Sequence, residues 1–266
     1  MIVKLTLKDC GTGAGGFQPG NTCASGGGGG TGGGGSSGGR SGGGTGGDAD
    51  RRSRISAASN PNTPSSTLAE LSKDESEVVR IDVAKNPNTP PAALVELAKD
   101  ENSVVRVKVG SNPSTPVATL AELSNDDVSV RTSVAHNLRT PIDALAALSK
   151  DVDDVVRRVV AHNLRTPIDA LAALSKDVDD VVRFTVAKNL NTPSATLAEL
   201  SKDEEWSVRL EVARHPNTPA TALSVMSKDG FWGVRAAIAK NPNTPPATLA
   251  ELRRDSNKNV RRAARR

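Results

Sequence analysis

The chain has 266 residues, with 34 basic and 30 acidic side chains and only five aromatic ones, two Trp and three Phe. No apolar run approaches the roughly 20 residues of a membrane span, so we expect no transmembrane segment. Two cysteines are too few for a typical disulfide-stapled secreted domain, and residues 1–9 lack the apolar core of a signal peptide, which together predict a cytoplasmic protein. The formal charge of +4 resolves by segment: residues 253–266 have 7 basic residues and one acidic residue, whereas residues 51–252 have 24 and 26.

Two glycine-rich segments come first. Residues 1–25 hold both cysteines, and residues 26–50 are Gly/Ser-rich, so we expect a disordered, flexible arm without apolar surface to offset its ordering entropy. Cys10 and Cys23 predict a small reduced or disulfide-closed loop, with a metal shared between two chains as the alternative. Gly11, Gly13 and Gly16 have the spacing of a dinucleotide fingerprint without its strand and helix, so we predict no cofactor.

From about residue 51 one unit recurs along the chain. It reads Val-Arg-x-x-Val-Ala-x-Asn-Pro-x-Thr-Pro, then x-x-x-Leu-x-x-Leu, then Asp. Its threonine returns at steps of 26 residues, with one step of 25, at Thr63, Thr89, Thr115, Thr140, Thr166, Thr192, Thr218 and Thr244. Such a period predicts a solenoid, in which each unit buries its apolar face only against its neighbours. We therefore predict an all-α fold, with an α-solenoid of about eight tandem 26-residue two-helix repeats over residues 51–266, ending in a half repeat.

Each unit predicts two short helices. Thr-Pro predicts the start of the first, with Thr as N-cap and Pro at the first helical position. Asp143 and Asp169 would strengthen that start from the third position, and Leu at i and i+3 then gives one buried stripe on a helix of about nine residues. The second helix has Val at i and i+4 beside Ala, as in Val79, Val83 and Ala84. Neither helix is long enough to be stable alone, so stability must come from packing between units.

Two charged columns follow the repeat. Asp recurs eight times and Arg nine times, at Arg54, Arg80, Arg106, Arg131, Arg157, Arg183, Arg209, Arg235 and Arg261. A phosphate-binding strip is one interpretation of the arginines. Because nearly every Arg has an acid six residues earlier, we favour a structural ladder in which the guanidinium groups bond Asp or free carbonyls at helix ends.

No arrangement of residues indicates catalysis or a metal site. His136 and His162 lie one repeat apart in a column where several other units have Lys or Arg, so we expect a solvated face, and His215 replaces the Asn that ends a helix. The acidic turns at 151–154 and 177–180 lack the Gly and distal Glu of a calcium loop. We predict a non-enzymatic protein without cofactor, metal or small-molecule substrate.

The repeat resembles that of the leucine-rich repeat variant family, bacterial α-solenoids whose units pair an α-helix with a second short helix. The similarity rests on Val-Arg-x-x-Val-Ala-x-Asn-Pro-x-Thr-Pro-x-x-x-Leu-x-x-Leu and covers about residues 51–266. It implies an α-solenoid with a binding role and no catalytic residues. The unit is longer than the family's usual one, which gives room for both helices to be α. The family's founding member is associated with an N-terminal cysteine cluster that holds an iron–sulfur centre, and Cys10 and Cys23 do not reproduce that cluster.

Residues 134–157 and 160–183 are the same 24 residues written twice, VAHNLRTPIDALAALSKDVDDVVR. An inserted unit displaces everything beyond it by roughly 10 Å, which a catalytic constellation seldom tolerates and a modular binding surface can. This favours a non-enzymatic scaffold that binds a protein partner.

Two sets of residues are candidates for partner binding. Trp206 and Trp232 fall at the same position of successive units, with Phe231 beside the second, and they either form an interface hot spot or fold over the turn and seal the array. The second set is a cationic cluster for nucleic acid or another polyanion, which is the alternative function. Its members are Arg253, Arg254, Lys258, Arg261, Arg262, Arg265 and Arg266. No aromatic residue is interleaved with these cations, so we place protein binding first.

Overall fold

The computed structural model describes residues 45–265, which belong to a single compact part of the chain, residues 44–266. The segment 1–25, with Cys10 and Cys23, lies outside the described residues, as does most of the segment 26–50. Helix α1 spans Thr45–Ser59, so the end of the segment expected to be a linker is helical from residue 45.

The described residues form helices numbered α1 to α17, without strands. After α1, the first helix of each unit is α2 Ser65–Leu71, α4 Pro91–Leu97, α6 Val117–Leu123, α8 Ile142–Leu148, α10 Ile168–Leu174, α12 Ser194–Leu200, α14 Ala220–Met226 and α16 Pro246–Leu252. The second helix is α3 Glu77–Lys85, α5 Ser103–Ser111, α7 Val128–His136, α9 Asp154–His162, α11 Asp180–Lys188, α13 Trp206–Arg214, α15 Trp232–Lys240 and α17 Lys258–Ala263. None of these helices is long and apolar enough to cross a membrane.

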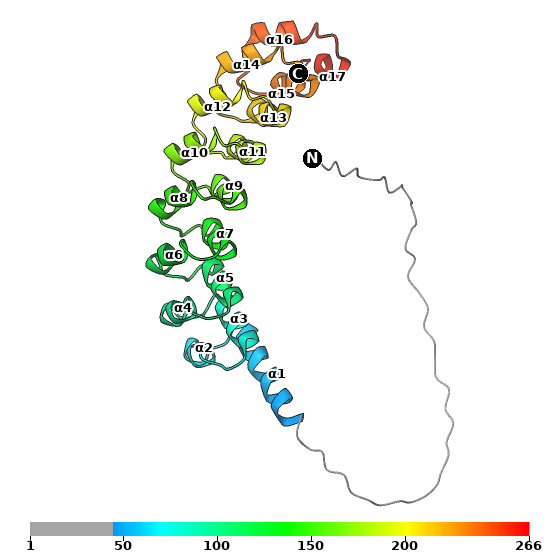
Figure 1. Cartoon of the computed structure of the whole chain (residues 1–266). Helices are drawn as coiled ribbons and strands as arrows, with labels where there is room; N and C mark the ends of the chain where they lie inside the picture. Colours follow the sequence, from blue (N-terminus) through cyan, green and yellow to red (C-terminus); the bar gives the residue numbers. More distant parts are fainter. Residues whose placement is uncertain (1–44, 266) are drawn as a thin grey trace, which may run out of the picture. The chain divides into compact units, whose positions relative to one another are not determined.

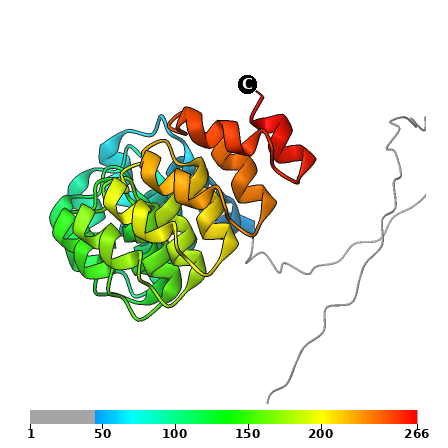
Figure 2. The same ribbon diagram turned by 90° about the horizontal axis from the view of Figure 1, so that it is seen from above.

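The helices stack as two columns, one of even-numbered and one of odd-numbered helices (Figure 1). Each odd-numbered helix packs on the next odd-numbered one, and the even-numbered helices α2 to α12 pack on both of their sequence neighbours, whereas α14 and α16 pack on α15. Seen from above, successive units lie over one another (Figure 2). Between the columns lies a continuous core of buried residues from both, such as Val79 and Val83 of α3 and Leu94 of α4. This arrangement confirms the predicted α-solenoid.

The predicted role of Thr-Pro at the start of the first helix is wrong. Proline itself is the N-cap, as with Pro116 at φ −59° and ψ 144°, and the even-numbered helices have seven residues. Thr115 is fully buried, and its hydroxyl donates a 2.6 Å hydrogen bond to the carbonyl of Val109 in the preceding helix. That carbonyl lies in the last turn of α5, where it also accepts a 3.0 Å bond from the backbone amide of Asn112. The threonine side chain therefore bonds the C-terminal end of the preceding helix. Asp143 and Asp169 lie in the first turns of α8 and α10, and neither helix has a side-chain bond at its N-cap.

The asparagine that ends each second helix ties neighbouring units together. The Asn112 Nδ2 group donates to the carbonyls of Ala84 and Asn86 in the preceding unit, at 2.7 and 2.9 Å. Its Oδ1 atom accepts from the amide of Ser114 at 2.8 Å. The same pattern recurs with Asn86, Asn137, Asn163, Asn189 and Asn241. A buried amide with several satisfied bonds fixes the register of the stack.

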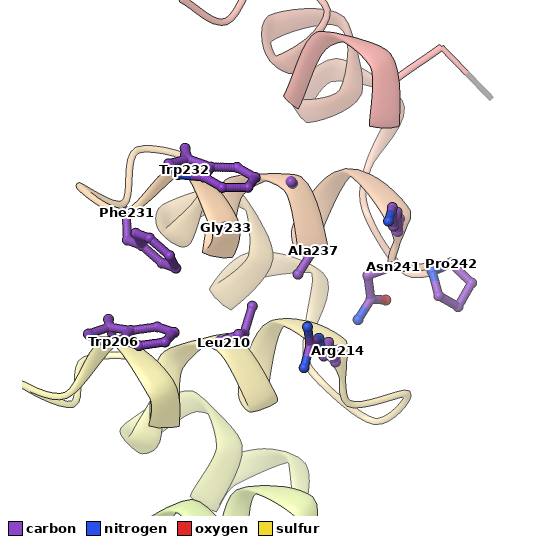
Figure 3. A pocket seen from close by; sticks show the side chains of 11 residues that line it. Trp206, Leu210, Arg214, Phe231, Trp232, Gly233, Ala237, Asn241 and Pro242 are labelled. Carbon is purple, nitrogen blue, oxygen red and sulfur yellow. The ribbon is translucent and has the colours of Figure 1, made fainter. Parts of the chain in front are cut away.

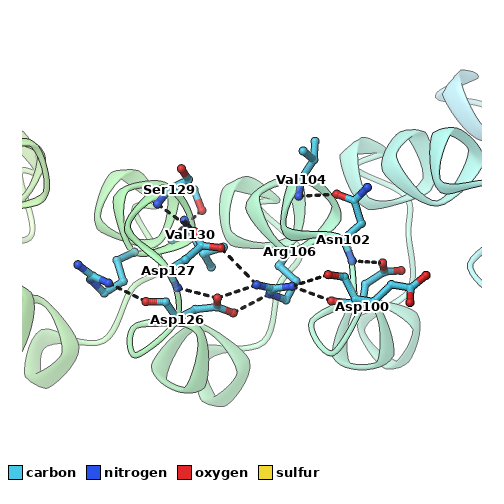
Figure 4. Close-up of polar contacts among 11 residues, drawn as sticks. Asp100, Asn102, Val104, Arg106, Asp126, Asp127, Ser129 and Val130 are labelled. Atoms are coloured by element: carbon cyan, nitrogen blue, oxygen red, sulfur yellow. Dashed lines mark hydrogen bonds and ion pairs between the residues drawn. The ribbon is translucent and has the colours of Figure 1, made fainter.

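The Arg and Asp columns form the predicted ladder, with a different carboxylate partner (Figure 4). Arg106 donates from Nε and Nη2 to the carboxylate of Asp126 in the next unit, at 2.7 and 2.9 Å. The acid six residues earlier, Asp100, accepts through its backbone carbonyl at 2.8 Å. These bonds from Arg106 hold the pKa of Asp126 below its ordinary value, although partial burial opposes the shift. The guanidinium fork is thus occupied within the solenoid, which disfavours a phosphate-binding strip.

Candidate functional site

The aromatic residues singled out in the sequence form one cluster near the C-terminal end of the solenoid. Trp206 and Trp232 begin helices α13 and α15, and Phe231 immediately precedes α15. The Phe231 ring lies between the two indoles, with centroids 4.6 Å from Trp206 and 5.8 Å from Trp232 (Figure 3). These tilted contacts are within the range of favourable aromatic pairs. The indoles nevertheless keep 48% and 42% of their surface exposed, so the cluster presents a wide apolar face to solvent.

Phe231 occupies a position that other units use to cap the helix. Asn102, Asp153 and Asn257 stand in that column, and each accepts a backbone N–H bond from the first turn of its helix. Phe231 has no side-chain cap bond. Replacing a good cap by a residue that cannot accept a hydrogen bond costs about 1 kcal/mol. In α3 and α13, Ser76 and Glu205 also make no cap bond, but in α15 an aromatic ring takes the capping position, and such departures from a repeat concentrate at functional sites.

Gly233 is a second departure in the same unit. Several other units have valine at this position, including Val155 and Val181. A Cβ atom added to Gly233 would lie 2.5 Å from Cε1 of Phe231. The glycine thus leaves the space over the first turn of α15 that the Phe231 ring fills. Phe231 and Gly233 both differ from the residues common in other units, and together they allow one aromatic ring to pack over the first turn of α15.

A groove of about 400 Å³ extends from this cluster between α13 and α15 (Figure 3). Its floor includes Leu210 from α13, together with Ala236 and Ala237 from α15. Arg214 and Lys240, at the ends of the two helices, line the opposite end. The groove is therefore aromatic at one end, aliphatic along its floor and cationic at the other end.

A second hollow continues on the other side of Trp232, towards α17. Trp232, Ala236 and Lys240 line both hollows, and the second adds Asn259, Arg262 and Ala263. Arg262 comes from the basic cluster predicted in the sequence. The structure thus brings one member of the cationic set onto the same surface as the aromatic set.

The other basic residues have different surroundings. Arg253 donates from Nε to the carbonyl of Ala264 at 3.0 Å, and Arg261 donates from Nη1 to the carbonyls of Asp255 and Ser256, both at 2.7 Å. Arg253 thus bonds the C-terminal end of α17, and Arg261 bonds the turn that precedes its own helix. Exposed side chains elsewhere in this set are Arg254, Lys258 and Arg265, whereas Arg266 lies outside the described residues. The predicted cationic set is thus part structural and part exposed surface.

The histidines do not converge on a site. His136 and His162 are exposed, as expected from their column. His215 is buried, and its Nε2 atom lies 3.0 Å from the carbonyl oxygen of Asn189, while its Nδ1 accepts from the amide of Asn217. Burial lowers the pKa of His215, although the bond to Asn189 opposes that shift. Within residues 45–265 no group of three His, Cys, Asp or Glu side chains is placed to hold a metal ion.

Leu210, Arg214, Gly233 and Lys240 complete the groove and were missed from the sequence. A column-by-column comparison could have found Gly233, since it breaks the valine column beside Phe231. The sequence did not single out Arg214 and Lys240, because basic residues such as Lys85 and Lys188 occupy the same position in other units. Only the groove distinguishes these two cations from the rest of their column.

Stacked two-helix units with a continuous core define the chain as an α-solenoid repeat protein. Residues 232–257 match the family model described as "Leucine rich repeat variant". The fold is similar to a solved leucine-rich repeat variant with a repetitive structural motif, at a TM-score of 0.59 and 29% identity, covering 74% of this chain and 78% of that chain. It also aligns with YibA of E. coli at a TM-score of 0.47 and 16% identity, covering 80% and 94%. A search of curated proteins finds no match. The family-model match and the similarity to the solved leucine-rich repeat variant confirm the resemblance to that family.

Proposed function

We propose that this protein is a non-enzymatic scaffold that binds a protein partner through the groove of α13 and α15. The observation that carries the proposal is Phe231, which stands where other units have a helix cap and lies between two half-exposed indoles. Trp is enriched at interface hot spots because it buries a large area while losing little rotamer freedom. A solenoid presents such a surface on rigid, repeated elements.

The repeat architecture supports a binding role over catalysis. The columns of Arg and Asp that recur along the chain are engaged with each other, as in the 2.6 Å pair between Arg157 Nε and Asp177 Oδ2. The exposed groove offers aromatic, aliphatic and cationic groups, which suit recognition of another chain. We also propose that the scaffold acts in the cytoplasm, because a sequence with two cysteines is typical of a reducing compartment.

Nucleic-acid binding is the rival function. Arg254, Lys258 and Arg265 are exposed and supply the cations that it requires. Nucleic-acid surfaces usually extend a positive track along many elements. Here the arginines that recur along the repeats are paired with aspartates, and lysines also recur at the surface, some of them close to an acid, as Lys176 is to Glu199 at 3.8 Å. We therefore place protein binding first.

The double variant Trp206→Ala and Trp232→Ala tests this function. The matched control is Val152→Ala with Val178→Ala, because both valines are 93% exposed and line neither hollow of the site. Affinity capture with mass spectrometry, with and without nuclease, should retain one protein on the wild type and on the control. The tryptophan variant should lose that protein while staying folded, with a melting temperature lower by roughly 5–15 °C, as expected for a loss of about 2–4 kcal/mol from two half-buried rings.

Two results would contradict the proposed function. A larger fall in melting temperature of the tryptophan variant would show that the indoles seal the core. If nuclease treatment abolishes capture of the protein, nucleic acid and not a direct protein contact links it to the solenoid. Rebinding of the purified partner to the wild type, but not to the tryptophan variant, is the required positive result.

A further inference from the structure

The two ends of the groove differ in chemistry, and helix geometry fixes the distance between them. Trp206 and Arg214 begin and end α13. Eight residue steps at about 1.5 Å each separate them by roughly 12 Å along the helix axis. An extended chain covers that distance in three or four residues, at about 3.3 Å per residue. The groove therefore matches a short segment that offers one group to each end.

The aromatic end is suited to a bulky apolar side chain. The rings of Trp206, Phe231 and Trp232 surround it, and Leu210 continues the apolar surface along the floor. A side chain with large apolar area gains most from such a wall, since burial is favourable in proportion to the area removed from water. A flat aromatic side chain adds the tilted ring contacts that already occur inside the cluster.

The opposite end is suited to a carboxylate. Arg214 and Lys240 line it, and Arg262 lines the adjoining hollow. Glu211 forms a 2.7 Å ion pair with Arg214 Nη1 and so holds one side of that guanidinium in place. The second edge of an arginine fork can bind a carboxylate with parallel hydrogen bonds, and the ammonium group of Lys240 adds a second cation at this end of the groove.

We propose that the partner enters this groove as an extended acidic peptide segment, with a bulky apolar side chain against Trp206, Phe231 and Trp232 and a carboxylate three or four residues away against Arg214 and Lys240. The inference rests on the proposed protein-binding function and specifies the chemistry of the partner. Charge complementarity selects an acidic segment over a neutral or basic one.

A single-stranded nucleic acid fits the same groove less well. Its bases could stack on the indoles, but its phosphates recur along the whole strand. Glu204 and Glu205 immediately precede Trp206, so a strand that stacks there would bring phosphates towards two carboxylates. A peptide places its negative charge at one end only, away from these acids.

The test uses the full chain and labelled synthetic probes. The acidic probe is a fluorescein-labelled Gly/Ser peptide with one Trp and a Glu-Glu pair about three positions later. Its analogues carry Gln-Gln or Lys-Lys in place of the acids, and a labelled single-stranded RNA of similar length is the fourth probe. Fluorescence anisotropy should show that the acidic peptide binds at least about tenfold more tightly than the Gln analogue, and that added salt narrows this difference.

Charge reversal locates the contact. The double variant Arg214→Glu and Lys240→Glu should weaken the acidic probe by at least about tenfold. Lys150→Glu with Lys202→Glu makes the same change in net charge at exposed residues that line neither hollow, so it should leave the affinity unchanged within about twofold. An equal loss in both variants would mean that only the overall charge matters, which contradicts the proposal.

The remaining outcomes separate this inference from the function it rests on. Equal binding of the Gln analogue, tighter binding of the RNA, or no binding of any peptide would overturn the acidic-segment proposal. The proposed function would still stand if the captured protein rebinds to the wild type and not to the tryptophan variant. Failure of that rebinding would reject the function itself.

Discussion

Removal of one asparagine side chain in the middle of the solenoid should destabilise it strongly. Asn163 is 3% exposed, and its Nδ2 group donates to the carbonyls of Ala135 and Asn137, at 2.7 and 3.3 Å. Its Oδ1 atom accepts from the amide of Arg165 at 2.9 Å. Asn163→Ala therefore leaves two acceptors and one donor without these bonds. At about 1 kcal/mol or slightly more for each, the free energy of unfolding should fall by about 3–4 kcal/mol.

Urea unfolding followed by circular dichroism measures this change. Asn137 begins the same bonding pattern one unit earlier, in the identical 24-residue stretch, so Asn137→Ala is an internal replicate. Asn191→Ala is the control, because that side chain is exposed and bonds one carbonyl at the surface. A loss below about 1 kcal/mol in both buried variants, with an unchanged dependence on urea, would mean that asparagine does not tie the units together.

Individual contacts give four further predictions. His215→Asn should raise the free energy of unfolding by about 1 kcal/mol in urea titrations, because asparagine donates to two carbonyls where the histidine ring bonds one. Since burial lowers the folded-state pKa of His215 below its ordinary 6.5, the wild type should also lose stability as the pH falls below 6.5, and the His215→Asn variant should lack that slope in unfolding measured across the range. Burial opposes ionisation of Asp177, but hydrogen bonds led by the one from Arg157 outweigh burial and lower the pKa of Asp177. The ionised carboxylate therefore stabilises the fold at pH values above its ordinary pKa of 3.8, and this stabilisation is lost as the pH falls through the folded-state pKa. In acid unfolding, the Asp177→Asn variant should lack this pH-dependent loss of stability. Gly233→Ala should displace the Phe231 ring and weaken partner binding in a pull-down, while the melting temperature changes by only a few degrees.

The solenoid was predictable because its signal is repeated. Valine and leucine at fixed steps in eight units specify two buried stripes, and the structure buries Val79, Val83 and Leu94 as expected. The Arg ladder was also predictable, since matched columns of opposite charge indicate pairing. Its exact partner was not, because the sequence places Asp100 and Asp126 at either side of Arg106 without showing which carboxylate the fork reaches.

The roles of threonine and asparagine were harder to predict for a related reason. A Thr before Pro at a helix start satisfies the usual capping pattern, but Thr115 has a nearer acceptor in the helix it follows. Likewise, Asn112 ends a helix in the sequence, while its amide bonds to the unit before. Both residues act between elements, and a local pattern gives no information on which neighbour approaches them.

The candidate site was predictable where it departs from the repeat. Trp206, Phe231 and Trp232 stand out because aromatic residues are scarce in this chain. Arg214 and Lys240 do not stand out, since cations are ordinary in their column. The packing of α13 against α15 turns these two cations into the far end of a groove, and that packing depends on the three-dimensional stack.

Phe231 replaces a helix cap with a ring that we assign to partner binding, and Phe231→Asn separates these two roles. Asparagine restores the capping residue found at Asn102 and Asn257, worth about 1 kcal/mol. Loss of the half-buried ring costs on the order of 1–2 kcal/mol. Urea unfolding should therefore give a free energy within about 1 kcal/mol of the wild type, while the captured protein no longer rebinds. Undiminished rebinding, or a fall of more than about 3 kcal/mol in the free energy of unfolding, would show that the Phe231 ring belongs to the scaffold and does not serve partner binding.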